Sequence, residues 1–328
     1  MNKLTIKIAT AVSSAALIVS SFATPLMATT VEVSGNGSDS DNTVQVQQTN
    51  TTTVNQTNTA NISNNIDVDV DTGNNEAEDN TGGDVSIDTG DASATVGVST
   101  TVNSNQASVN GCCPNDVTLK ISGNGSDSGN NDENNIKFNS SNTNKITQDN
   151  QADIDNNVDV DLDTGENDAN DNTGGAVSVT TGDADATVTV NNTANANWAA
   201  ITGGGSGGGV AVEISDNGSD SDNTVEVGLK TNNQINQSND ADISNNIDVD
   251  ADTGDNEAKD NTGGEVSIDT GDANATVDVS NVANFNAAEL AGCGCVEDLE
   301  VLVKDNGTDS NNTVKLNLGS VQVAGQTN

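Results

Sequence analysis

The chain lacks the residue types on which many active sites depend. Its 328 residues include no histidine, no tyrosine and no arginine, because all nine basic residues are lysines. Such a chain cannot build a histidine-based triad, a histidine-ligated metal site or a bidentate arginine clamp. Its 50 acidic residues give a formal charge of −41, which repels the phosphates of nucleic acid. These absences predict a protein that is not an enzyme and has no nucleic-acid partner.

Aromatic residues and proline are also scarce. Aromatic residues make up 1% of the chain, and there are only two prolines. A globular enzyme normally builds its core on leucine and aromatic side chains. Here valine is the main large apolar residue, and most other positions hold Asn, Asp, Thr, Gly or Ser. These residues favour strands and turns, so we predict an all-β protein, with a largely disordered chain as an alternative.

Residues 1–28 have the pattern of a secretory signal peptide. Lys3 and Lys7 precede a stretch of apolar and small residues, and Ala28 is the expected last residue before cleavage, with Ala23 as the alternative. Cleavage leaves 50 acidic residues and seven lysines, a formal charge of −43. The sequence therefore predicts an extracellular or cell-surface protein with no membrane span after signal cleavage.

The rest of the chain repeats at a period of about ninety residues. The segment Ser34–Ser40 (Ser-Gly-Asn-Gly-Ser-Asp-Ser) recurs at 122–128, recurs at 215–221 with Asp in place of the first Gly, and recurs at 305–310 as Asp-Asn-Gly-Thr-Asp-Ser. Asn64–Gly73 likewise recurs from Asn156 and from Asn245. The predicted units are repeat 1 (31–116), repeat 2 (117–211, ending in a Gly-rich linker), repeat 3 (212–298) and a truncated fourth repeat or cap (299–328).

Each unit divides further into blocks of about 18 residues with Gly, Asn and Asp at the joints. Within the blocks, residues 66–71 and 85–88 alternate aliphatic and polar side chains, as strands with one buried face do. We therefore expect tandem repeats folded as a β-solenoid with turns of about 18 residues and ladders of stacked asparagine inside. A string of β-sandwich domains is the alternative, since ninety residues is a normal size for one.

Two resemblances support this class of protein. The segment Gln56-Thr-Asn-Thr-Ala-Asn-Ile62, with its counterparts at 148–154 and 237–243, resembles the Asn-x-Ala-x-Val/Ile part of curlin repeats. Curlins are secreted bacterial subunits that stack into adhesive fibres, so this local resemblance implies a surface or matrix role. The whole chain resembles the Asn/Thr/Asp-rich secreted repeat proteins of candidate-phylum bacteria, which implies no activity.

Nine aspartates are the candidate metal ligands, because hard cations such as calcium prefer carboxylate oxygens. They fall at alternate positions in the same segment of each unit: Asp67, Asp69, Asp71, Asp159, Asp161, Asp163, Asp248, Asp250 and Asp252. The spacing does not complete an EF-hand loop, because the twelfth position holds Glu78, Asn170 or Lys259 in turn. Calcium on this face is the hypothesis, and a solvated acidic face is the alternative.

Two recurring motifs have a simpler explanation as turns. Asp-Thr-Gly begins at Asp71, Asp88, Asp163, Asp252 and Asp269. An aspartic protease uses this triplet twice in a covered cleft, whereas here it ends acidic strands, so a strand-to-turn junction is the better interpretation. The Asn-Gly-Ser-Asp-Ser segments, which carry Asp39, Asp127, Asp220 and Asp309, are interpreted as tight turns.

The four cysteines lie at unit ends, at Cys112, Cys113, Cys293 and Cys295. In an exported chain they predict disulfides, with the connectivity open, and a four-thiolate zinc site is the alternative. Cys112 and Cys113 are poorly placed to bond each other, so bridges between chain ends or between subunits are expected.

Together these patterns predict an acidic repeat protein with a structural or adhesive role at the cell surface or in extracellular matrix. Partners would be further copies of the chain or surface and matrix components. Residues 301–318 reproduce the opening strands of a unit, and we expect them either to cap the array or to stack on residues 31–48 of another molecule. The alternatives are a solenoid that binds a ligand, ice or carbohydrate, and a β-helix enzyme that acts on polysaccharide.

Overall fold

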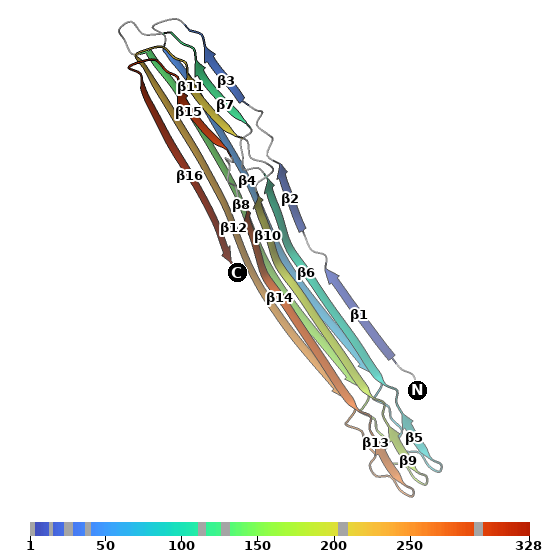
Figure 1. Cartoon of the computed structure of the whole chain (residues 1–328). Helices are drawn as coiled ribbons and strands as arrows, with labels where there is room; N and C mark the ends of the chain where they lie inside the picture. The colour runs from blue at the N-terminus through green and yellow to red at the C-terminus, as the bar shows by residue number, and fades with distance from the viewer. Residues whose placement is uncertain are drawn as a thin grey trace.

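The computed structural model describes residues 4–12, 16–22, 29–36, 41–110, 116–125, 132–202, 209–291 and 298–328. Strands dominate these residues, and every strand pair is parallel. Paired residues of successive repeats lie 88 to 93 positions apart, and most lie 92 apart between repeats 1 and 2 and 89 apart after that, as in Asp67↔Asp159 and Asp159↔Asp248. Each repeat therefore forms one turn of a β-solenoid, which confirms the predicted fold (Figure 1). The expected turn of about 18 residues is wrong, because one turn takes a whole repeat and the strand Asn42–Asp71 alone runs through 30 residues.

Four stacked sheets make up the solenoid. Sheet A contains β1 (Leu4–Val12) and β2 (Ala16–Phe22), both beside β6 (Ala92–Asn110), then β10 (Ala184–Thr202) and β14 (Ala273–Ala291). Sheet B contains β3 (Thr29–Ser34), β7 (Val117–Ser122), β11 (Val210–Ser215) and β15 (Leu299–Lys304). Sheet C contains β4 (Asn42–Asp71), β8 (Asp132–Asp163), β12 (Ser221–Asp252) and β16 (Asn311–Thr327). Sheet D contains β5 (Val85–Asp88), β9 (Val177–Thr180) and β13 (Val266–Asp269).

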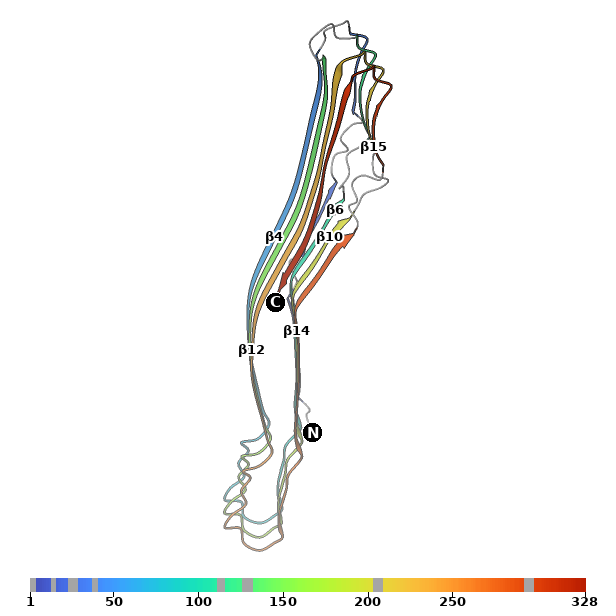
Figure 2. The ribbon, with the colours of Figure 1, turned by 60° about the vertical axis from the view of Figure 1, so that its left-hand side comes forward.

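The turns are long and flat, so the solenoid has two layers (Figure 2). The long strands of sheet C form one layer, and sheets A and B form the other. Val44 of sheet C packs in one apolar cluster with Leu119 of sheet B, whereas Val68 of sheet C packs with Val96 of sheet A. Valine, isoleucine and alanine suffice for this core because the layers meet through alternate residues of each strand.

Asparagine ladders divide the apolar clusters, as the sequence predicted. The most continuous of them, which we call the amide spine, zigzags between sheets C and A. Its members are Asn58, Asn105, Asn150, Asn197, Asn239 and Asn286. Each side-chain amide donates to the carbonyl oxygen of the next member, over 2.7–2.9 Å. Because every member donates in the same direction, the spine has a polarity along the solenoid axis, and buried polar groups are satisfied without water.

A bulge bends sheet A in each turn. Asn103, Asn195 and Asn284 have φ angles of 59°, 60° and 63°, in the left-handed region that asparagine tolerates. The ladder between β6 and β10 omits Asn103 and Asn195. Beyond this bulge, the alternation of inward-facing and outward-facing side chains is therefore shifted by one residue. The side-chain amide of Asn103 donates to the backbone oxygen of Gln151 in sheet C at 2.6 Å, which ties the bulge to the opposite layer.

The N-terminal residues that resemble a signal peptide lie beside repeat 1. β1 and β2 pair in parallel with β6, in the register that a preceding repeat would have. The expected cleavage position, Ala28, and its alternative, Ala23, lie outside the described residues.

Candidate functional site

The nine candidate ligands form a grid on the outward surface of sheet C, which we call the acidic face. Asp67, Asp159 and Asp248 occupy equivalent positions on β4, β8 and β12, and the other two triplets stack in the same way. Val68, Val160 and their equivalents alternate with the aspartates and point into the core. Strand geometry therefore spaces the carboxylates about 4.8 Å apart across the strands and about 6.6 Å apart along them.

The crowding of these carboxylates changes their acidity. Partial burial, together with the charges of Asp250 and Asp69 on the flanking strands, raises the pKa of Asp161 above its ordinary value. Burial also raises the pKa of Asp163, although its hydrogen bond from the Gly165 amide opposes the shift. The central strand of the grid is thus the place where negative charge is least favourable.

The Asp-Thr-Gly triplets that end the long strands form the turn that the sequence predicted. The carboxylate of Asp71 accepts a hydrogen bond from the backbone amide of Gly73 at 2.7 Å. The hydroxyl of Thr72 donates to the backbone oxygen of Gly90 at 2.9 Å, which closes the small lobe that contains sheet D. A Cβ on Gly73 would overlap the carbonyl oxygen of Gly165 in the next turn, so only glycine fits this stack. The two hydrogen bonds recur in repeats 2 and 3, and the close approach of the glycine recurs at Gly165, which meets Gly254.

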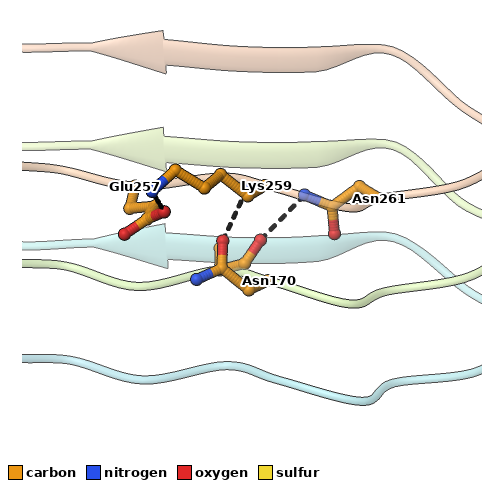
Figure 3. A network of polar contacts seen from close by, with 5 residues as sticks. Asn170, Glu257, Lys259 and Asn261 are labelled. Atoms are coloured by element: carbon orange, nitrogen blue, oxygen red, sulfur yellow. Dashed lines mark hydrogen bonds and ion pairs between the residues drawn. The ribbon is translucent and has the colours of Figure 1, made fainter.

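The loop beyond the acidic face does not supply a common closing ligand. Glu257 of repeat 3 forms an ion pair with Lys259, and the backbone amide of Lys259 donates to the side-chain oxygen of Asn170 (Figure 3). Asn261 donates to the backbone oxygen of Ala169 in the same network at 2.9 Å. In the part of the chain that the structure describes, no three acidic, cysteine or histidine side chains are gathered closely enough to hold a metal ion by themselves.

The other predicted site residues either lie in tight turns or fall outside the described residues. Asp220 and Asp309 have φ angles of 61° and 63° in tight turns, and the neighbouring Asn217 donates to Asn306 at 3.1 Å. This geometry matches the interpretation as turns. Asp39 and Asp127 lie outside the described residues, as do the four predicted disulfide cysteines (Cys112, Cys113, Cys293 and Cys295).

Sequence reasoning missed a second outward surface on sheet C, which we call the lysine face. It comprises the outward-pointing residues of Thr43–Asn55 in β4, Asn135–Thr147 in β8, Thr224–Asn236 in β12 and Thr313–Gly325 in β16. Its charged residues are Lys137, Lys145, Lys230, Lys315 and Glu226. Sorting the sequence by alternate positions could have found it, but only once the pairing of repeats was known.

A shallow hollow of about 390 Å³ lies on the lysine face. Gln45, Lys137, Asn139, Glu226, Gly228 and Lys230 are among the residues that line it. Lys137 and Glu226 form an ion pair of 3.0 Å across β8 and β12, and both side chains stay nearly half exposed. The site thus offers amides and ammonium groups to solvent on an otherwise acidic protein.

No family model, curated protein or solved structure matches the chain. Among the described residues, no helix has the length and apolar character needed to cross a membrane.

Proposed function

We propose that this is an exported, non-enzymatic β-solenoid with a structural or adhesive role at the cell surface or in extracellular matrix, and that calcium stabilises it. The observation that carries the proposal is the in-register grid of nine aspartates on the acidic face. A rigid two-layer solenoid presents these carboxylates at fixed spacing, which suits repeated contact with ions and surfaces better than turnover of one substrate.

The grid explains why a divalent cation would stabilise the fold. Two carboxylates about 4.8 Å apart repel by about 1 kcal/mol even in a water-like dielectric, and each strand adds further pairs. The side chains of Asp69, Asp161 and Asp250 form the central column of this grid. Calcium accepts six to eight oxygen ligands, so an ion bound at the surface would coordinate carboxylates from adjacent turns together with water.

A column of substitutions tests the calcium proposal. The triple variant Asp69→Asn, Asp161→Asn and Asp250→Asn removes the central column. Calcium should raise the thermal unfolding midpoint of the wild type, measured by circular dichroism, well above the effect of equal ionic strength in sodium chloride. The variant should be more stable than the wild type without calcium and should gain much less from calcium.

The matched control removes three acids from a different column. Asp91, Asp183 and Asp272 stack near the start of sheet A, and the carboxylates of Asp91 and Asp183 accept hydrogen bonds from the backbone amide of the next turn. Their replacement by asparagine makes the same change in net charge but should leave most of the calcium response intact. If both triple variants lose the response equally, the acidic face is not the calcium site.

Export has its own test. Expression in a secreting bacterial host, followed by N-terminal sequencing of the protein in the medium or on the cell surface, should give a chain that begins at Thr29. Retention of intact residues 1–28 in the cytoplasm would contradict the localisation.

We further propose that copies of the chain associate end to end. β14 lies at the outer edge of sheet A, and its Val282 and Phe285 are 60% and 61% exposed. Parallel strands and the one-way donation of the amide spine favour head-to-tail over head-to-head contact, because a second copy in that orientation would continue both ladders. Light scattering across calcium and salt concentrations should show oligomers that grow with calcium, and a monomer under all conditions would contradict the proposal.

A further inference from the structure

Charge is segregated along the strands of sheet C. The lysine face carries four lysines and one glutamate, in a chain with a formal charge of −41. The outward positions of the remaining half of the sheet, from residue 57 of β4 and its equivalents onward, carry no lysine and 14 aspartates. The aspartates are Asp67, Asp69, Asp71, Asp149, Asp153, Asp155, Asp159, Asp161, Asp163, Asp240, Asp242, Asp248, Asp250 and Asp252. The solenoid thus concentrates four of the seven lysines that remain after the signal segment on one surface.

Hydrogen-bonding side chains fill most of the lysine face. Apart from the charged residues, its positions on β4, β8 and β12 hold only Thr, Asn, Gln, Ser and Gly. Thr49, Asn139 and Ser141 line the hollow beside the ion pair of Lys137 and Glu226. Such a surface matches a ligand that is rich in hydroxyl groups and carries isolated negative charges, because amides and hydroxyls both donate and accept.

The absence of a side chain at Gly228 helps to form the hollow. A Cβ on Gly228 would come within 2.5 Å of the side-chain oxygen of Asn139 on the neighbouring strand. Lys230, next but one along β12, also lines the hollow and is exposed. Within the described residues, no carboxylate lies within ion-pair distance of the Lys230 ammonium group. The hollow therefore has a positive group available for a ligand.

The net charge of the protein does not prevent an anion from reaching this surface. Asp240, on the same strand, is roughly 40 Å from Gly228 at about 3.3 Å per residue. Asp222, in the other direction along β12, is roughly 20 Å away by the same measure. Both distances exceed the screening length of about 8 Å at physiological ionic strength. The Glu226 carboxylate in the hollow is already ion-paired with Lys137 at 3.0 Å, so a bound anion would interact mainly with Lys230 and the other lysines of the face.

We propose that the lysine face binds an acidic polysaccharide, of the kind whose sugar units carry carboxylates. A carboxylate of the glycan pairs with Lys230 in the hollow, and its hydroxyls exchange hydrogen bonds with the amides and hydroxyls of adjacent turns. A duplex nucleic acid fits less well, because its charge density is high and the chain has no arginine with which to clamp phosphates. Such a glycan would be the partner for the proposed adhesive role, and the proposal rests on that role.

Two double variants with matched changes test the proposal. Lys137→Gln with Lys230→Gln removes two lysines from the lysine face and leaves Glu226 without its partner. Lys120→Gln with Lys304→Gln removes two lysines from sheet B and likewise leaves Glu213 without its partners, which lie 3.6 Å away on both sides. Binding to polygalacturonate is measured by titration calorimetry in about 0.15 M sodium chloride with EDTA, so that calcium cannot bridge the glycan to the acidic face.

The expected result is measurable binding of polygalacturonate by the wild type and none of a neutral glucan. The first double variant should lose at least tenfold in affinity, and the second should change it less than twofold. Gly228→Ala, which reduces the hollow, should also weaken binding, and circular dichroism should show that its fold is intact because the clashing Asn139 side chain can turn away.

Three outcomes would overturn the proposal. They are equal losses in the two double variants, equal binding of the neutral glucan, and no binding of polygalacturonate by a folded wild-type protein. Preferential binding to anionic lipid vesicles over the glycan would assign the face to a membrane surface instead. Because these measurements are made in EDTA, their failure leaves the calcium response of the acidic face untouched.

Discussion

Replacing Asn150 by aspartate puts an oxygen in place of one side-chain amide nitrogen at the centre of the amide spine. Asn150 is fully buried, and its side-chain amide donates to the oxygens of Asn197 at 2.8 Å and of Asn239 at 3.1 Å. Its own side-chain oxygen accepts from Asn105 at 2.7 Å. In Asn150→Asp, a carboxylate oxygen faces two acceptor oxygens, so two hydrogen bonds are lost and a charge is buried beside oxygen dipoles.

The expected cost is about 3–5 kcal/mol of unfolding free energy at neutral pH, the range for an uncompensated buried charge. Desolvation and the facing oxygens should raise the pKa of the carboxyl group introduced by this substitution, because both disfavour its charged form. A raised pKa in the folded state means that the penalty is present at high pH and disappears as the pH falls through that pKa. The protonated acid can then donate to one of the two oxygens, so the variant should recover part of its stability in acid.

The control lies in an exposed ladder of the same chemistry. Asn157 donates to Asn65 at 2.8 Å and accepts from Asn246 at 2.7 Å, but on the solvent side of sheet C. Asn157→Asp should cost about 1 kcal/mol or less, because water solvates the new charge. Urea denaturation followed by circular dichroism, between pH 7 and pH 4, measures both variants. Equal losses at Asn150 and Asn157, or a gap that does not narrow in acid, would refute the role of the spine.

Other substitutions test separate parts of the fold. Gly165→Ala should unfold the protein or cost more than about 3 kcal/mol, because its Cβ meets the backbone of the next turn, whereas Gly319→Ala, which meets nothing within 4 Å, should be neutral in the same urea experiment. Lowering the pH from 7 toward 5 should raise the thermal unfolding midpoint, because the pKa of Asp161 is raised in the folded state and its unfavourable charge is lost in acid. Asp161→Asn should raise the midpoint at pH 7 and reduce this pH dependence. A wild-type midpoint that falls steadily as the pH is lowered would contradict the reasoning. Phe138→Ala should cost about 3–5 kcal/mol because Phe138 is fully buried, whereas Phe285→Ala, at 61% exposure, should cost less than about 1 kcal/mol by the same assay.

Part of the acidic face was predictable from local patterns. Alternation placed Asp67, Asp69 and Asp71 on one side of a strand, and the repeats placed their equivalents at matching positions. The number of residues in one solenoid turn was not predictable in the same way, because asparagines such as Asn50 and Asn58 resemble turn residues when they are read along the chain. Inside the solenoid the side chain of Asn50 donates to Asn142 in the next turn, so it supports a straight strand of 30 residues instead of ending one.

The lysine face shows the same limit. Lys137 and Lys230 are 93 residues apart in sequence, and no local pattern relates them. They share a hollow because β8 and β12 pair with an offset of 89 residues, which places Lys137 opposite Glu226 and Lys230 opposite Ser141. Charge segregation is therefore a property of the pairing register.

By itself, the amino-acid sequence determined the all-β class, the repeat, the glycine-closed turns and the presence of asparagine ladders, because each depends on residues close together in the chain or on simple repetition. Three other features follow from the three-dimensional pairing of strands: one repeat makes one turn, sheet A bulges at Asn103, and acids and lysines separate along sheet C. These features depend on which residues face each other across adjacent turns and layers. An asparagine side chain can bond its own turn or its neighbour in a stack, and the parallel stacking of repeats at about 4.8 Å selects the second.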